Sequence, residues 1–213
     1  MRYLTLVLAT LLGCGLVAAQ DDGWVDLFNG EDLTGWKLVN EAGRQSWSVV
    51  DGILTNTSTH EATGTDLMTE EKFGSHELHV EFRVPVGGNS GVYVQGRFEC
   101  QVADTAAATE LGPGICGGIW ATSPPLKNAA KPAGEWQTYD IIFHAAKLDA
   151  DGNVTEPARM TVKLNDELVQ DNVACPAATG GHVDDKVAEP GPLMLQGNHS
   201  SVEYRNIRVR VLE

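Results

Sequence analysis

The sequence has little positive charge, few cysteines and, beyond its N-terminus, no long apolar run. Its 213 residues include 15 Lys and Arg against 29 Asp and Glu, which gives a formal net charge of −14. A surface this acidic repels phosphate backbones and anionic lipids, so the composition argues against a nucleic-acid partner and against peripheral membrane binding. No segment after the N-terminus is long and apolar enough for a membrane span. With 42% hydrophobic residues, the composition is that of a folded globular protein, not of a disordered or collagen-like one.

The N-terminus has the pattern of an export signal. Arg2 is the only charge before an apolar run from Leu4 to Leu12, and small residues precede position 20. The run is too short to span a bilayer, and this order of features is typical of a cleaved secretory signal. We therefore predict a signal peptide over residues 1–19 and a single domain over residues 20–213, exported to the periplasm or the extracellular space. In an alternative interpretation the sequence around Cys14 is a lipobox, and the mature protein is a lipoprotein anchored through that cysteine.

Three cysteines remain after the predicted cleavage, an odd number in a compartment that permits disulfides. We expect Cys100 and Cys116 to form a disulfide, because the Gly-rich stretch between them can fold back. A bond that involves Cys175, or three free thiols, are the alternatives. A catalytic thiol is disfavoured, since no Cys-His motif of a known thiol family accompanies any of the three.

Apolar residues recur with a period of two, which is typical of strands. From His76 to Val84, apolar residues occupy every second position and charged or polar residues alternate with them. Asp51-Gly52 and Asn165-Asp166 have the composition of tight hairpin turns. Short strands punctuated by Gly and Pro, with little helical pattern, predict an all-β antiparallel sandwich or barrel. Further strands are expected at residues 91–95, 97–102, 138–144, 158–164, 167–170, 193–196 and 202–211.

Residues 87–104 carry the densest group of candidate site residues. Alternation puts Glu99 and Gln101 on one face, with Tyr93 and Gln95 beside them on the neighbouring strand. A carboxylate flanked by amides and an aromatic ring can polarise a hydroxyl and stack on a sugar ring. Burial would raise the pKa of Glu99 toward the range useful for acid–base catalysis. The alternative is that these are ordinary exposed strand residues.

Several segments in order along the chain resemble one family. Residues 27–36, with the sequence LFNGEDLTGW, closely resemble the opening of the 3-keto-disaccharide hydrolase family. The resemblance continues through residues 88–92, 131–140 and 191–193 and covers essentially residues 24–212. It implies a concanavalin A-like jelly roll, the antiparallel β-sandwich of lectins and glucanases, which agrees with the period-two pattern.

The resemblance also implies a reaction, the cleavage of glycosides already oxidised at C3. The C3 ketone acidifies the C2 proton, so a base removes it, the C1 substituent leaves by elimination, and water adds back. Such a site needs a base, an acid for the leaving oxygen, and donors or a cation for the C3 enolate. From strand alternation and the resemblance together, we predict Glu99, Gln101 and His199 for catalysis. The predicted substrate-binding residues are Asn89, Tyr93, Gln95, Arg97, Asp104, Trp120, Lys131 and Gln196.

Some of these positions have a second interpretation. Lys131 supplies positive charge or pairs with Glu135 at the surface, and Asp104 binds sugar or a cation or only begins a turn. The chain has Gln196-Gly197-Asn198-His199 where relatives often show Gln-Asp-His-Gly, and Trp120 where Tyr is common.

The sequence therefore predicts an exported hydrolase or lyase whose partner is a carbohydrate, here a 3-keto disaccharide. A non-catalytic carbohydrate-binding module is the alternative, and a structural domain at the cell surface is a third interpretation. No cofactor is required by the sequence, although a divalent cation is compatible with it. Nothing in the sequence indicates an oligomeric state.

Overall fold

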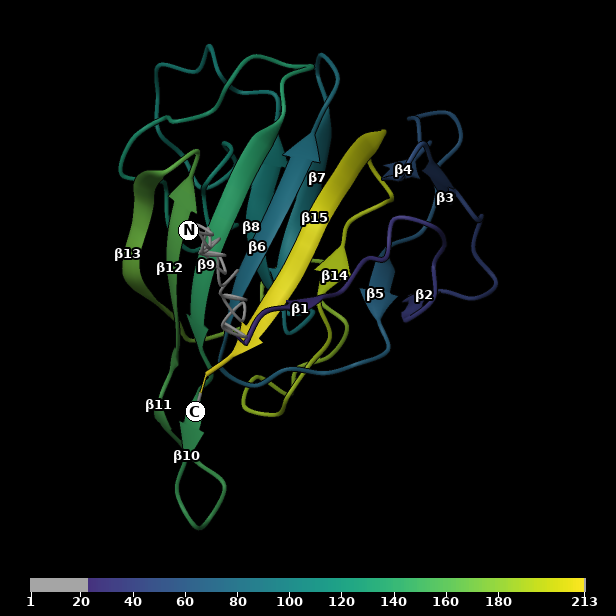
Figure 1. Ribbon diagram of the computed structural model, residues 1–213. Coiled ribbons are helices and arrows are strands. Elements are labelled where there is room, and N and C mark those ends of the chain that lie inside the picture. Colours follow the sequence, from purple (N-terminus) through teal and green to yellow (C-terminus); the bar gives the residue numbers. More distant parts are fainter. Residues whose placement is uncertain (1–22, 213) are drawn as a thin grey trace, which may run out of the picture.

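The computed structural model describes residues 23–212 (Figure 1). The predicted signal peptide and the alternative lipid anchor at Cys14 lie outside these residues. The described chain consists of strands and loops without a helix, so the all-β prediction is confirmed. Accordingly, residues 23–212 contain no helix that is long and apolar enough to cross a membrane.

Two antiparallel sheets pack face to face with the hydrophobic core between them, as expected for a sandwich. The larger sheet has eight strands, seven of which follow one path. In spatial order they are β13 (Glu167–Cys175), β12 (Ala158–Leu164), β9 (Gln137–His144), β6 (His76–Arg83), β15 (Val202–Val211), β4 (Ile53–Asn56) and β3 (Trp47–Val50). The eighth strand, β1 (Val25–Asp26), pairs with β15 off this path.

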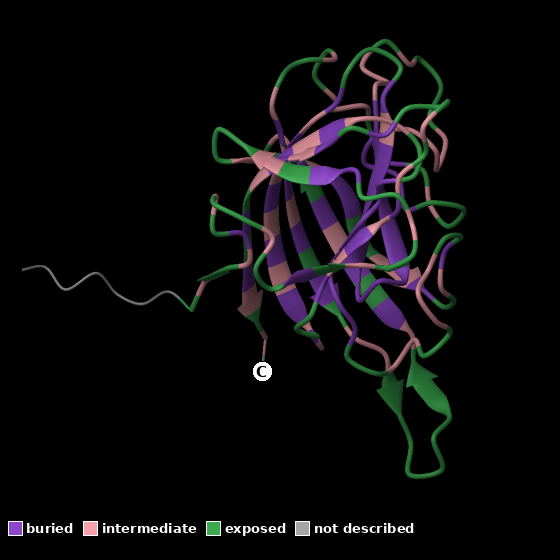
Figure 2. Ribbon diagram, turned by 90° about the vertical axis from the view of Figure 1, so that its right-hand side faces the viewer, coloured by how far each residue is buried: buried purple, intermediate pink, exposed green. Residues whose placement is uncertain are grey.

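The smaller sheet carries the site. It has five strands in the order β2 (Trp36–Leu38), β5 (Leu67–Thr69), β14 (Met194–Leu195), β7 (Asn89–Val94) and β8 (Phe98–Ala103). A separate ribbon of β10 (Lys147–Leu148) and β11 (Val154–Glu156) projects from the body of the domain and is exposed along its length (Figures 1 and 2).

The period of two in the sequence is the period of burial in the structure. Along β6, buried and half-buried residues alternate at every position, with Leu78, Val80 and Phe82 facing the core. Figure 2 shows the same alternation in other strands of the large sheet. Because successive side chains of a strand point to opposite faces, this alternation is what places one face against the second sheet.

Tight turns fix the register of the hairpins. Asp51 and Asn165 have φ of 51° and 53°, and the residues after them also have positive φ, as two-residue hairpin turns require. Both predicted turns are confirmed. A third turn joins β7 to β8 through Gln95 and Gly96, with φ of 52° and 63°. It sets Tyr93 opposite Glu99 and thereby aligns the residues of the site.

The predicted disulfide is wrong: Cys100, Cys116 and Cys175 are all free, buried thiols. Cys100 lies on the core side of β8, where burial raises its pKa well above the ordinary range. Cys116 contacts the hydroxyl of Tyr139 at 3.4 Å, and that hydroxyl also accepts a hydrogen bond from the Gly117 amide at 2.7 Å. The loop between the two cysteines is therefore held by a buried phenol and by backbone pairing with β8, not by a sulfur–sulfur bond.

Candidate active site

The candidate site lies on the outer face of the five-stranded sheet. Across β7 and β8, Tyr93 is opposite Glu99 and Gly91 is opposite Gln101. Since these residues alternate with the core residues of the same strands, their side chains share the face that points away from the core. The sequence prediction that Glu99, Gln101 and Tyr93 lie together therefore agrees with the structure.

A polar pocket of about 230 Å³ opens on this face. Its volume is below the ~300–1,000 Å³ of drug-sized ligand sites, so it fits about one sugar ring. It is lined by Asn89, Tyr93, Glu99, Gln101, Trp120, Gly180, Gly181, Gln196, Asn198 and His199. A larger cavity of about 570 Å³ lies between the ends of β4, β6 and β15, but its lining is mostly apolar and its one charged pair, Arg83 and Glu203, is already bonded at 2.5 Å.

Glu99 is the buried acid of the pocket. Its side chain is almost inaccessible, at 3% relative exposure, and one carboxylate oxygen accepts a hydrogen bond from the Tyr93 hydroxyl at 2.8 Å. Burial, opposed by the Tyr93 hydrogen bond and assisted by the negative charge of Asp66, raises the pKa of Glu99 to about 7. A carboxyl group with this pKa both takes and gives a proton near neutral pH.

A glycine makes room for this carboxylate. The Glu99 side chain lies over Gly91 of the neighbouring strand, so that a Cβ added at Gly91 would stand only 2.8 Å from Glu99 Cγ. The backbone at this position has no positive φ, so the requirement for glycine comes from the closeness of Glu99 and not from the local conformation.

The side-chain amides of Asn89 and Gln101 lie in the pocket with Glu99 and are hydrogen-bonded to each other. Gln101 donates a hydrogen bond from Nε2 to Asn89 Oδ1 at 2.8 Å, and the Asn89 backbone amide donates to the Ser200 hydroxyl at 2.8 Å. Within residues 23–212, Asn89 Nδ2 has no hydrogen-bond partner. The pair is therefore oriented and still has an N–H group for a ligand oxygen.

Asp66 is a second carboxylate near the pocket that the sequence analysis missed. It directly precedes β5, and its Oδ1 accepts a hydrogen bond from the Gly197 amide at 2.8 Å. Burial raises the pKa of the Asp66 carboxyl above its ordinary value, although this hydrogen bond and the nearby His199 act in the opposite direction. The one available signal was its alternation with the buried Leu67, which places it on the same face as the site residues of β7 and β8.

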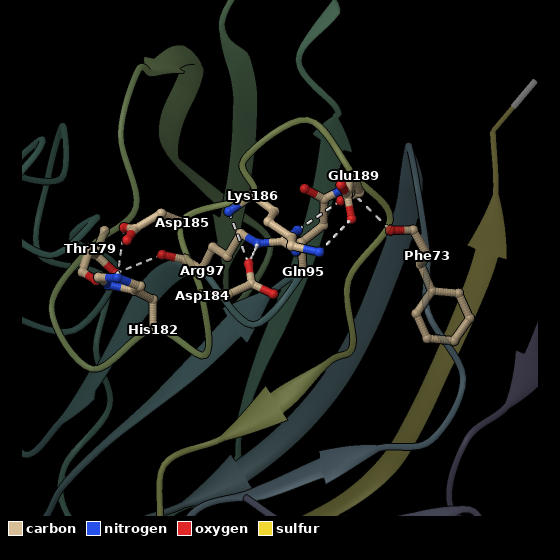
Figure 3. A network of polar contacts seen from close by, with 9 residues as sticks. All are labelled: Phe73, Gln95, Arg97, Thr179, His182, Asp184, Asp185, Lys186 and Glu189. Atoms are coloured by element: carbon tan, nitrogen blue, oxygen red, sulfur yellow. Dashed lines mark hydrogen bonds and ion pairs between the residues drawn. The ribbon is translucent and has the colours of Figure 1, made fainter. Parts of the chain in front are cut away.

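One wall of the pocket is the loop 176–192, which also closes over the β7–β8 turn (Figure 3). Arg97 is 1% exposed and fastens this loop: its Nε is 2.6 Å from Asp184 Oδ1, and its Nη1 donates to the Glu189 carbonyl at 2.7 Å. The loop contributes Gly180 and Gly181 to the pocket, two further residues that the sequence analysis did not select.

Trp120 forms the rim. The backbone of residues 117–120 pairs along the edge of β8, with the Trp120 amide donating to the Glu99 carbonyl at 3.1 Å. Its indole packs on Gly180, where a Cβ would stand 3.5 Å from Nε1, and 42% of the residue stays exposed. An exposed indole at the mouth of a polar pocket suits stacking on a sugar ring.

The structure places four predicted binding residues outside this pocket. Gln95 lies in the turn, where strand alternation no longer applies, and its Nε2 donates to the Phe73 carbonyl at 3.2 Å. Arg97 is covered by the loop that it fastens. Asp104 accepts from the Gly87 amide at 2.9 Å and so fixes a turn. Lys131 is exposed and donates to the Trp136 carbonyl at 3.2 Å instead of pairing with Glu135.

The other predicted residues line the pocket. These are Glu99, Gln101, His199, Asn89, Tyr93, Trp120 and Gln196. His199 is exposed, with Nδ1 in contact with Asn198 Oδ1, and its Nε2 has no hydrogen-bond partner among residues 23–212. The described part of the chain contains no group of three or more His, Cys, Asp or Glu side chains arranged to hold a metal ion.

Known proteins share this fold and this sequence pattern. A candidate glycosyl hydrolase from Parabacteroides distasonis has a solved structure that matches with a TM-score of 0.76 and 31% identity, over 90% of this chain and 84% of that one. A 3-keto-disaccharide hydrolase from Bacteroides thetaiotaomicron is 25% identical over an alignment that covers 90% of this chain and 79% of the relative. The carbohydrate-binding module CBM66 from Bacillus subtilis matches with a TM-score of 0.52 and 12% identity, which shows a common jelly-roll fold only.

The family that the sequence resembles is also found by direct comparison. The sequence model of the 3-keto-alpha-glucoside-1,2-lyase-like domain matches residues 23–210, which is nearly the whole described chain. Two of the relatives described above are consistent with this match. The chain therefore belongs to the 3-keto-alpha-glucoside-1,2-lyase-like domain family.

Proposed function

We propose that this protein cleaves 3-keto glycosides, such as a 3-keto disaccharide, by elimination followed by hydration, with Glu99 as the principal acid–base group. One observation carries the proposal: a buried carboxyl with its pKa raised to about 7 stands beside an oriented amide pair in a pocket that fits one sugar ring. The relative from Bacteroides thetaiotaomicron, which is named a 3-keto-disaccharide hydrolase, supports the substrate class.

The proposed reaction begins at C2 of the sugar. Ionised Glu99 takes the C2 proton, and the electron pair of the C–H bond forms the C1–C2 double bond through the C3 enolate. The C1–O bond breaks and the leaving oxygen takes a proton. Water then adds its hydroxyl to C1 and gives its remaining proton to the group that protonated the leaving oxygen, and Glu99 returns its proton to C2. Glu99 is suited to the first and last of these proton transfers because its two protonation states are close in free energy near neutral pH.

Other residues of the pocket have supporting roles in this proposal. The Asn89 amide, held by Gln101, donates to the C3 enolate oxygen, where donors stabilise developing negative charge. His199, which also lines the pocket, protonates the leaving oxygen. Trp120 stacks on the sugar ring at the rim.

The test is turnover of 3-keto-trehalose by the wild type and by Glu99→Gln, followed as released hexose with and without a chelator. We expect Glu99→Gln to retain the fold and to lose at least about a hundredfold in kcat, because acid–base catalysis contributes roughly 10²–10⁴-fold. Glu135→Gln is the matched control, since Glu135 is an exposed Glu remote from the pocket. Unchanged turnover in Glu99→Gln would remove Glu99 from the mechanism.

Solvent isotope incorporation separates elimination from direct hydrolysis. In D₂O, elimination and hydration place deuterium at C2 of the product, whereas direct attack at C1 leaves the C2 hydrogen in place. An enzyme-free sample corrects for spontaneous exchange next to the ketone. Binding of the sugar without product release would contradict the proposal and would support the alternative of a carbohydrate-binding module.

We also propose that the protein is exported, on the strength of the apolar run from Leu4 to Leu12 behind Arg2. N-terminal sequencing of the mature protein should give Gln20 as the first residue. A lipid attached at Cys14 would support the lipoprotein interpretation instead.

A further inference from the structure

The Tyr93 hydroxyl has more acceptors around it than it has protons. Its oxygen is 2.8 Å from Glu99 Oε2 and 2.8 Å from the Gly180 carbonyl oxygen, and Gln196 Nε2 donates to it at 3.3 Å. A phenol has one O–H to donate. Burial, with the nearby charge of Glu99, raises the pKa of Tyr93, so the phenol keeps that proton at physiological pH.

The protonation state of Glu99 decides which of the two acceptors receives the hydrogen bond from the Tyr93 hydroxyl. When Glu99 is ionised, the phenol donates to the carboxylate, because a charge-assisted hydrogen bond is the stronger one, and the Gly180 carbonyl loses its donor. When Glu99 is protonated, its own O–H donates to the Tyr93 oxygen, and Tyr93 donates to Gly180. All three groups are then satisfied, so the protonated state binds Gly180 more firmly.

Gly180 belongs to a short wall segment that one backbone hydrogen bond holds to the β7–β8 turn region at each end. On one side, the Thr179 amide donates to the Arg97 carbonyl at 2.8 Å, and on the other the Val183 amide donates to the Gly96 carbonyl at 2.9 Å. Gly181, with φ of 80°, passes so close to Tyr93 that an added Cβ would be 2.8 Å from the hydroxyl. Between these ends, the bond from Tyr93 is the hydrogen bond that joins the Gly180 backbone to the sheet.

We propose that Tyr93 is a positioning residue that couples the proton on Glu99 to the Gly180-Gly181 wall of the pocket. The wall is held when Glu99 carries a proton and loosens when Glu99 is ionised. This deepens the proposed function. The pocket admits substrate while Glu99 is ready to act as a base, tightens once Glu99 holds the C2 proton, and loosens again when that proton has been returned.

Four other titratable groups lie around Glu99. The charge of Glu99 interacts with Asp66, just before β5, and with Cys100 and Tyr204, whose pKa values burial raises so that both keep their protons at physiological pH. His199 lines the same pocket from the loop after β14. His182, on the wall loop, contacts the Thr179 carbonyl through Nδ1 and lies 3.0 Å from Asp185 through Nε2. These contacts also hold the wall loop, so the contribution of His182 has to be measured separately.

The test is amide hydrogen exchange of Thr179 and Val183 in the protein without substrate, measured by NMR and corrected for the intrinsic pH dependence of exchange. In the wild type we expect protection to fall about fivefold between pH 6 and pH 8, the effect of losing one hydrogen bond. Glu99→Gln, whose amide also donates to Tyr93, should keep the high protection at both pH values. Tyr93→Phe should show the low protection at both.

His182→Gln is the control and should retain the pH dependence of the wild type. Wild-type protection that does not change with pH would overturn the proposal, and so would a pH dependence that persists in Glu99→Gln. Because the readout needs no substrate, this result is independent of whether the protein cleaves a 3-keto glycoside. Circular dichroism of each variant identifies any that fail to fold, and Glu99→Gln and Tyr93→Phe test the coupling from its two ends.

Discussion

Glu99 should make the stability of the folded protein depend on pH, and Glu99→Gln should remove that dependence. The pKa of Glu99 is raised from 4.5 to about 7, chiefly by burial. A raised pKa means that the folded state binds the proton more tightly than the unfolded state does. The resulting stabilisation is full below about pH 4.5, declines as the pH rises, and is lost above about pH 7.

The size of this pH-dependent change in stability follows from the shift in the pKa of Glu99. Each pKa unit corresponds to about 1.4 kcal/mol, so the shift of Glu99 corresponds to roughly 3 kcal/mol in the free energy of unfolding. The side chain is 3% exposed, so solvent does little to screen this energy. Asp66, whose pKa burial also raises, is present in both proteins and contributes to both curves.

The assay is urea unfolding followed by tryptophan fluorescence between pH 4.5 and pH 8, for the wild type and for Glu99→Gln. The free energy of unfolding of the wild type, relative to that of Glu99→Gln, should fall by about 2–3 kcal/mol as the pH rises across this range. Glu135→Gln should follow the wild type at every pH. If the free energy of unfolding of the wild type relative to Glu99→Gln stays constant or rises with pH, the pKa of Glu99 is not raised in the folded protein.

Three further predictions test the surroundings of Glu99. Gly91→Ala should displace the Glu99 carboxylate and reduce kcat at least about tenfold, because a charge-assisted hydrogen bond of roughly 1.5–3 kcal/mol is lost. Gly74→Ala is the control: its added Cβ meets nothing within 4 Å, so it should behave as the wild type in the same assay. Arg97→Met should lower the free energy of unfolding in urea by about 1–3 kcal/mol, because two loop acceptors lose a buried donor; an unchanged value would contradict the anchoring role. Trp120→Ala should raise KM about tenfold with little change in Tm, and a change in kcat alone would argue against a stacking role.

Much of the fold could be predicted from local patterns. The strands Ala158–Leu164 and Val202–Val211 have the predicted bounds, and the turn at Asp51-Gly52 forms as expected. These features depend on neighbours in sequence, since alternation sets the faces of a strand and positive φ favours Asp, Asn and Gly in tight turns. The prediction failed for Gln95, which leaves the strand for the turn, because one residue more or less in a turn changes which side chains share a face. The strand expected at residues 167–170 extends to Cys175.

The sequence by itself determined the sandwich, the outward alignment of Glu99 with Gln101 and Tyr93, and, through its resemblance to known relatives, the family. Only the tertiary structure decided which polar residues reach the pocket. Arg97 has the same strand parity as Glu99, yet a loop from far along the chain covers it, and Asp66 reaches the site from a distant strand. Alternation is a local property that gives each side chain a face, whereas burial, neighbouring charge and access to a ligand depend on which distant segments pack on that face.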